Sequence, residues 1–222
     1  MLMMWISALA IFNVLSLAAA RVGSKPQCPA PEFSTVADFD LQTFVSQRWY
    51  IQQQMPVSYL PASRNKCVYA EYSLKEKKSL LGYDIDVHNH AEDVNTDPGS
   101  ATKSYDANLC AKIVDAKNGK LEVAPCFVPS ALSGPYWVVD YSEAEGYAII
   151  SGGAPSISTD SGCRTGSGVN NAGFWIFTRK QERDERLVQK ARAVAAGKGF
   201  DLSVLNDVDQ TSCAGALVDE DM

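Results

Sequence analysis

The stretch Phe174-Trp175-Ile176-Phe177-Thr178-Arg179 decides the fold, because it ends a series of strands and directly precedes the clearest helical pattern in the chain. Its aromatic and β-branched residues predict a strand over 173–179. The following segment, 182–198, predicts an amphipathic helix. Its apolar stripe consists of Leu187, Val188, Ala191, Val194 and Ala195. A single helix of this kind can bury its stripe only against the outside of a β-structure.

Seven further strand-like runs precede this stretch. They are 49–55, 67–74, 80–88, 108–115, 120–127, 136–141 and 146–151. Eight short strands separated by turn residues predict an all-β sandwich or a closed barrel. The segment 151–173 is rich in Gly, Ser and Thr and is expected to form a long loop.

The two ends of the chain differ from the middle. Residues 1–20 are uncharged and finish in three alanines, which predicts a signal peptide and a secreted, extracellular or endomembrane-lumenal protein. This leader has no basic residue before its apolar core, so an uncleaved anchor is the alternative. Residues 21–37 contain three prolines and predict an extended, unpaired lead-in. The domain itself is expected over 38–213, followed by an acidic tail over 214–222.

Charge and composition exclude some functions. The formal net charge is −6 with 21% charged residues, and a nucleic-acid partner would require a basic face. The densest basic run, Lys75-Glu76-Lys77-Lys78, is expected to be an exposed turn. The leader inflates the hydrophobic fraction of 46%, but with 21% charged residues and aromatic residues throughout, the remaining chain is too apolar to be disordered.

All six cysteines follow the leader: Cys28, Cys67, Cys110, Cys126, Cys163 and Cys213. An even count behind a secretory leader predicts disulfides, although spacing alone does not choose among the 15 possible connectivities. No Cys-x-x-Cys pair suggests a zinc site of the usual spacing. A free reactive thiol is the functional alternative.

Three motifs in order resemble those of the lipocalin family. Gln47-Arg48-Trp49-Tyr50, after Phe39-Asp40-Leu41, resembles the first motif, and Pro135-Tyr136-Trp137-Val138-Val139-Asp140-Tyr141 resembles the second. The stretch 174–179 resembles the third. Their spacing is most similar to the apolipoprotein D, bilin-binding and plant temperature-induced branch. Gln47 replaces the motif glycine and Val139 replaces a threonine, so a different turn is expected there.

The resemblance implies an eight-stranded antiparallel up-and-down barrel with one C-terminal α-helix packed outside. Such a barrel encloses room for one small ligand. At its closed end Arg179 would stack on Trp49, with Asp140 and Tyr141 as further structural residues. The branch also implies the disulfides Cys67–Cys213 and Cys28–Cys163, which leaves Cys110 to pair with Cys126.

Strand alternation then selects candidate ligand-contacting residues facing the interior. They are Val68, Ala70, Tyr72, Tyr83, Ile85, Phe127, Trp175 and Phe177. Tyr72, Tyr83 and Trp175 are the best candidates because each combines apolar area with a polar group. For any one of these residues, filling of a core is the alternative.

Metal and catalytic sites are not expected. Asp84, Asp86, His88 and His90 share one face of a strand and could hold Zn²⁺ or Cu²⁺. Adjacent strands are expected to supply no further ligand, so a solvated outer face is the preferred interpretation. No nucleophile motif or acid–base pair is visible, which argues against an enzyme.

The sequence therefore predicts a secreted lipocalin that transports a small hydrophobic ligand: a fatty acid, sterol, retinoid, carotenoid or tetrapyrrole. One alternative is a lipocalin-like de-epoxidase or isomerase acting on a lipid or carotenoid. Another is an interaction or inhibitor module that uses the 151–173 loop. No cofactor is expected, a membrane surface or protein receptor is a further candidate partner, and the oligomeric state stays open.

Overall fold

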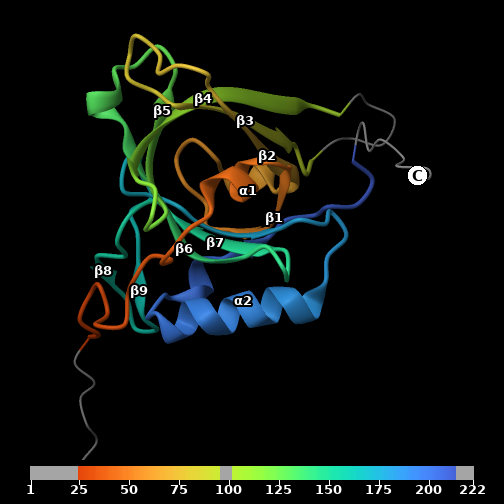
Figure 1. Ribbon diagram of the computed structural model, residues 1–222. Coiled ribbons are helices and arrows are strands. Elements are labelled where there is room, and N and C mark those ends of the chain that lie inside the picture. The colour runs from red at the N-terminus through yellow and green to blue at the C-terminus, as the bar shows by residue number, and fades with distance from the viewer. Residues whose placement is uncertain (1–24, 96–101, 214–222) are drawn as a thin grey trace, which may run out of the picture.

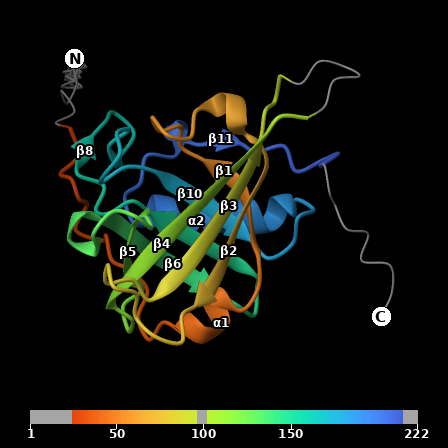
Figure 2. The same cartoon turned by 90° about the horizontal axis from the view of Figure 1, so that it is seen from above.

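A computed structural model describes residues 25–95 and 102–213, so the predicted leader 1–20 and tail 214–222 lie outside the described residues. Eight antiparallel strands form a closed barrel, viewed in Figures 1 and 2. They are β1 (Trp49–Gln54), β2 (Lys66–Leu74), β3 (Ile85–Glu92), β4 (Ser104–Asp115), β5 (Lys120–Pro125), β6 (Gly134–Ser142), β7 (Tyr147–Ser151) and β10 (Phe174–Thr178). Each pairs with its neighbour along the chain, and β10 pairs with β1 to close the ring. This confirms the predicted barrel.

Short elements complete the architecture. The helix α1 (Leu41–Val45) lies across one end of the barrel in Figure 1. The loop between β7 and β10, predicted to be irregular, contains the small hairpin β8 (Ile157–Ser158) and β9 (Cys163–Arg164). Three 3₁₀ turns are η1 (Ala62–Arg64), η2 (Ser130–Leu132) and η3 (Leu202–Val204). Finally, β11 (Asn206–Asp207) adds to β1 outside the ring.

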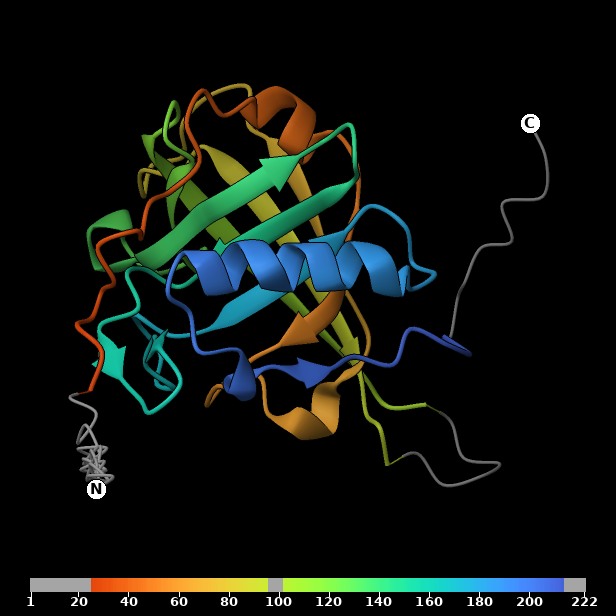
Figure 3. The ribbon, with the colours of Figure 1, turned by 90° about the horizontal axis from the view of Figure 1, so that it is seen from below.

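The helix α2 (Glu185–Gly197) packs against the outside of the barrel, as predicted (Figure 3). Its first turn is capped by Asp184, whose side chain accepts hydrogen bonds from the backbone N–H groups of Arg186 and Leu187. Val188, Ala191 and Ala195 are fully buried. Ala191 and Ala195 pack in one cluster with outward-facing residues of β6, β7 and β10. Among the described residues, the structure has no helix long and apolar enough to cross a membrane.

The hairpin of β3 and β4 differs from its predicted bounds. β3 begins at Ile85 rather than at residue 80, because the chain turns at Gly82 with φ of 91°. A Cβ atom at this glycine would lie 2.4 Å from Oγ of Ser130. The hairpin also extends further than predicted, through polar residues of 89–92 and 104–107. Those residues give no apolar alternation because much of this part of the hairpin is exposed.

The lead-in is not unpaired, which corrects the sequence prediction. The backbone N–H of Val36 donates to the carbonyl of Val138 on β6. The Phe33 ring stacks on Trp137 and meets Phe200 edge-on. The apolar side chains of the lead-in, which follow no periodic pattern among the prolines, therefore attach this segment to the barrel wall.

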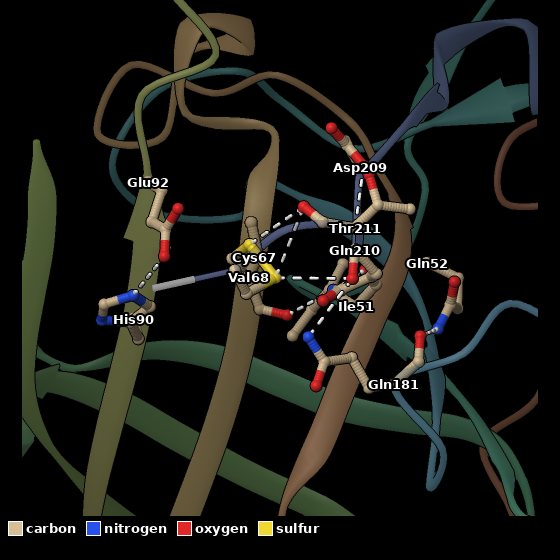
Figure 4. The surroundings of a disulfide bond; sticks show 11 residues. Ile51, Gln52, Cys67, Val68, His90, Glu92, Gln181, Asp209, Gln210 and Thr211 are labelled. Carbon is tan, nitrogen blue, oxygen red and sulfur yellow. Dashed lines mark hydrogen bonds and ion pairs between the residues drawn. A yellow bond between two sulfur atoms is a disulfide. The ribbon is translucent and has the colours of Figure 1, made fainter. Parts of the chain in front are cut away.

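The C-terminal segment fills a gap in the barrel wall. β1 and β2 pair through Trp49 with Ala70 and through Tyr50 with Tyr69. Further along, the Gln210 side chain lies between the two strands and donates to the carbonyls of Ile51 and Val68, both at 2.8 Å (Figure 4). The 206–213 segment is thus part of the wall.

Candidate ligand site in the barrel interior

Buried apolar and aromatic side chains from all eight barrel strands pack together in one cluster inside the barrel. It contains six of the eight predicted inward-facing residues: Val68, Ala70, Tyr72, Ile85, Trp175 and Phe177. Leu109, Ile113, Val123 and Tyr136 pack against the cluster and are only partly buried. The alternation of the strands therefore builds a continuous apolar wall, parts of which stay accessible.

Tyr83 does not face this interior. It is fully buried, but it packs with Cys110 and Ala124 on the outer side of the barrel. Its hydroxyl donates to the Val128 carbonyl at 2.7 Å. The prediction was wrong because Tyr83 lies in the turn before β3, where the alternation of the strand does not yet apply.

Phe127 was also placed wrongly. Its side chain is 83% exposed. β5 ends at Pro125, and the chain turns before Phe127 is reached. Counting the alternation two residues beyond the strand therefore assigned the wrong face.

Trp175 owes its position to the glycine two residues earlier. Gly173 has φ of 101°, and a Cβ atom there would lie 2.0 Å from the Trp175 ring. The ring therefore lies directly against the Gly173 backbone, which only glycine permits. Trp175 itself is 9% exposed on the inward face of β10.

Two tyrosine hydroxyls meet inside the apolar wall. The Tyr72 and Tyr136 oxygens are 2.6 Å apart. Burial raises the pKa of both phenols, and the neighbouring Tyr72 and Tyr59 raise the pKa of Tyr136 further. Both hydroxyls are consequently protonated at neutral pH. Tyr136 was not among the predicted inward-facing residues, although it lies two residues before the inward-facing Val138 on the same strand.

Gln54 is a second polar residue that sequence reasoning missed. It is fully buried and lies opposite Trp175 in the register of β1 and β10. Its Nε2 donates to Oδ1 of Asn65 at 2.8 Å, while its Oε1 accepts no hydrogen bond from the described part of the chain. No apolar pattern could reveal this residue, because three consecutive glutamines occupy 52–54.

The closed end is organised by Arg179, as the motif resemblance implied. Its guanidinium lies 3.6 Å from the Trp49 ring centroid. It also donates to the carbonyls of Thr43 at 2.9 Å and Gln47 at 2.7 Å, and forms an ion pair with Glu143 at 2.8 Å. Gln47 thus contributes its backbone carbonyl, and because its φ is not positive and its side chain is exposed, this position does not require glycine.

The two other predicted closed-end residues have different surroundings. The Tyr141 ring meets Phe39, Phe44 and Trp49 edge-on, and so forms part of the aromatic plug. Asp140 instead accepts a 2.6 Å hydrogen bond from the Tyr147 hydroxyl. Tyr147 belongs to the outer cluster under α2, so Asp140 joins β6 to β7 on that side.

All three predicted disulfides are present: Cys28–Cys163, Cys67–Cys213 and Cys110–Cys126. None of the described cysteines is free, so the alternative of a reactive thiol is not supported. Asp86 lies beside the Cys110 and Cys126 sulfurs. Because both sulfurs are consumed in a disulfide, these three residues offer no thiolate to a metal.

Comparison with known proteins identifies solved structures that share this fold. No protein-family model and no curated protein matches the sequence. Solved structures do match. Insecticyanin from the tobacco hornworm Manduca sexta is 17% identical, and the match covers 84% of this chain and 87% of that chain with a TM-score of 0.51. H1 crustacyanin from the lobster Homarus americanus is 14% identical, and the match covers 85% of this chain and 91% of that chain with a TM-score of 0.52. Lipocalin 12 from rat epididymis is 14% identical, and the match covers 89% of this chain and 98% of that chain with a TM-score of 0.51. At these identities the likeness concerns the fold alone.

Proposed function

We propose that this chain, which has the lipocalin fold, binds a small hydrophobic molecule inside its barrel and carries it. The observation that supports this most is the continuous inward wall of apolar and aromatic side chains. An eight-stranded barrel has an interior wide enough for one small ligand. Transfer of the ligand from water to this wall would supply about 25 cal/mol per Å² of apolar surface buried.

The polar groups of the interior favour a ligand that carries an oxygen atom. In the Tyr72–Tyr136 pair one hydroxyl proton lies between the two oxygens, and the other proton remains to be donated. A ligand carbonyl or hydroxyl can accept it, and Oε1 of Gln54 offers an acceptor in return. Sterols, retinoids, oxygenated carotenoids, tetrapyrroles and fatty acids all combine an apolar body with such oxygens.

Carriage is better supported than catalysis. A general base must be deprotonated near the working pH, whereas burial raises the pKa of Tyr72 and Tyr136. These phenols can orient a ligand but cannot take a proton from it at neutral pH. The three disulfides support an oxidising compartment, and we infer that the protein is secreted.

The test is a fluorescence titration with a dansyl-labelled fatty acid, using the disulfide-bonded chain. We expect saturable 1:1 binding, which Trp175→Leu weakens by about five- to fifty-fold because it removes inward apolar contact. Near-UV circular dichroism verifies that each variant is folded. Native mass spectrometry of protein isolated from its own source then identifies the natural ligand.

Phe127→Leu is the matched control. It also replaces an aromatic ring by leucine, but at a side chain that is 83% exposed outside the barrel. We expect its affinity to stay within twofold of the unmodified chain. Absence of saturable binding, or equal loss in both variants, would contradict a site in the interior.

A further inference from the structure

Exposed apolar side chains gather on two loops outside the barrel, one between β2 and β3 and the other between β5 and β6. Among the described residues, four of the nine exposed large apolar side chains lie on these loops: Leu80, Leu81, Phe127 and Leu132. Leu80 is fully exposed, and Leu132 is 66% exposed. Exposed apolar side chains that cluster, rather than scatter over the surface, point to an interaction site.

Hydrogen bonds hold the two loops side by side. The backbone N–H of Ser130 donates to the Leu81 carbonyl at 3.0 Å, and the Tyr83 hydroxyl donates to the Val128 carbonyl at 2.7 Å. In Figure 1 the yellow β2–β3 loop lies beside the green η2 turn at one corner of the molecule. The four apolar side chains therefore belong to one surface, the two-loop surface.

A buried cluster beneath this surface fixes the backbone of both loops. Tyr83 packs against Cys110 and Ala124 on the outer side of the barrel. Cys110 is bonded to Cys126, the residue before Phe127. Because the backbone is already ordered by these contacts, binding through the exposed side chains requires little further ordering of the chain.

The β5–β6 loop carries no charge that would have to leave water. Between Glu122 and Asp140 the sequence contains no Asp, Glu, Lys or Arg, although 21% of the whole chain is charged. Pro125, Pro129 and Ala131 in this stretch are exposed, in addition to the larger apolar side chains. Moving such a loop into a less polar environment avoids the free-energy cost of desolvating a charged group.

The β2–β3 loop supplies charges of both signs next to its apolar residues. Lys75 pairs with Asp86, and Nζ of Lys78 lies 3.2 Å from Oδ1 of Asp84. The exposed pair Glu76-Lys77 adds one charge of each sign. Balanced charges of this kind complement zwitterionic lipid headgroups, each of which carries a phosphate and an ammonium group. The net charge of −6, by contrast, disfavours a strongly anionic membrane.

We propose that the two-loop surface docks the protein onto a zwitterionic phospholipid membrane, where Leu80, Phe127 and Leu132 enter the region between headgroups and acyl chains. A stable protein–protein interface takes roughly 20–30 residues a side, and four side chains on two loops fall well short of that number. A lipid surface needs no matching pocket and accepts separate apolar side chains, while lysine ammonium groups stay at the headgroups. The surface lies outside the barrel, so docking does not depend on a ligand inside it.

The test is co-sedimentation of the disulfide-bonded chain with phosphatidylcholine vesicles. We expect saturable binding that does not strengthen when phosphatidylserine replaces about a third of the lipid, because the chain is acidic. Leu80→Ser and Leu132→Ser should each weaken binding about three- to tenfold, since each leaves one apolar side chain fewer to transfer from water. Near-UV circular dichroism verifies that the variants are folded.

Val94→Ser is the matched control. It also replaces an exposed apolar side chain by serine, but Val94 follows β3, at the opposite end of that strand from the β2–β3 loop. We expect its vesicle binding to stay within twofold of the unmodified chain. Equal loss in this variant, or binding that requires phosphatidylserine, would overturn the proposal.

A second measurement locates the contact without removing apolar surface. Phe127→Trp keeps an aromatic ring and adds a fluorescent probe at the loop. Phosphatidylcholine brominated on its acyl chains should quench this tryptophan more than those of the unmodified chain. Absence of this additional quenching, or a dimer in sedimentation velocity that Leu80→Ser dissociates, would show that the surface does not dock on lipid.

Discussion

At the residue scale, Arg179 connects three parts of the closed end through one buried guanidinium. We expect Arg179→Met to lower the free energy of unfolding by about 2–3 kcal/mol, because it removes the ion pair with Glu143 and the donors to the Thr43 and Gln47 carbonyls. Urea denaturation followed by tryptophan fluorescence measures this.

Arg186→Met provides the comparison. Arg186 is 93% exposed and lies 3.6 Å from Asp184, so its loss should change stability by less than about 0.5 kcal/mol. Equal effects of the two substitutions would mean that the Arg179 contacts do not stabilise the closed end.

Individual residues of the site differ in whether the sequence predicts their positions. Arg179 and Trp49 could be predicted because the motifs assign them residue by residue. Tyr83 and Phe127 could not, since alternation holds only inside a strand and both lie in turns. Bulges also interrupt the alternation of inward-facing and outward-facing side chains. The register of β1 shifts between Ile51 and Gln53, so alternation counted from Ile51 assigns the wrong face to the glutamines that follow.

At the scale of elements, the C-terminal segment could not be predicted either. Residues 206–210 have no periodic pattern, and their conformation follows from the gap that β1 and β2 leave for them. The helix α2, by contrast, was predicted because its stripe repeats over several turns. An element whose apolar residues repeat at a fixed spacing can be predicted from the sequence, whereas a segment whose conformation depends on a gap between other strands cannot.

The disulfides allow a quantitative prediction at this scale. Cys67–Cys213 closes a separation of 146 residues and Cys110–Cys126 one of 16. Loop-closure entropy then makes the longer link about 2 kcal/mol more stabilising. We expect the double variant Cys67→Ser/Cys213→Ser to unfold at lower guanidinium concentration than Cys110→Ser/Cys126→Ser.

The longer link should also carry a structural effect that the shorter one lacks. Without Cys213 the segment that places Gln210 between β1 and β2 loses its covalent attachment. Hydrogen exchange at the backbone amides of β1 should therefore increase in the first double variant and not in the second. The reverse order of stability would contradict this account.

At the scale of the whole molecule, buried tyrosines make the fold sensitive to alkali. Burial is the largest cause that raises the pKa of seven phenols: Tyr59, Tyr69, Tyr72, Tyr83, Tyr136, Tyr141 and Tyr147. In the unfolded chain each has a pKa near about 10. Above that pH the unfolded chain releases protons that the folded chain retains, so stability is fully present below pH 10 and falls as pH rises.

A buried phenol such as Tyr72, which stays protonated over this interval in the folded chain, removes about 1 kcal/mol of stability between pH 10 and pH 11. We expect the urea midpoint to fall over this interval, and tyrosinate absorbance at 295 nm to rise together with the loss of near-UV circular dichroism. Tyr72→Phe should lessen this pH dependence, because it removes one titrating phenol from the interior while keeping its ring. Tyrosinate absorbance that rises fully while the near-UV signal stays intact would show that the interior admits water and charge. Such a result would contradict the burial that raises the pKa of these phenols in the folded chain.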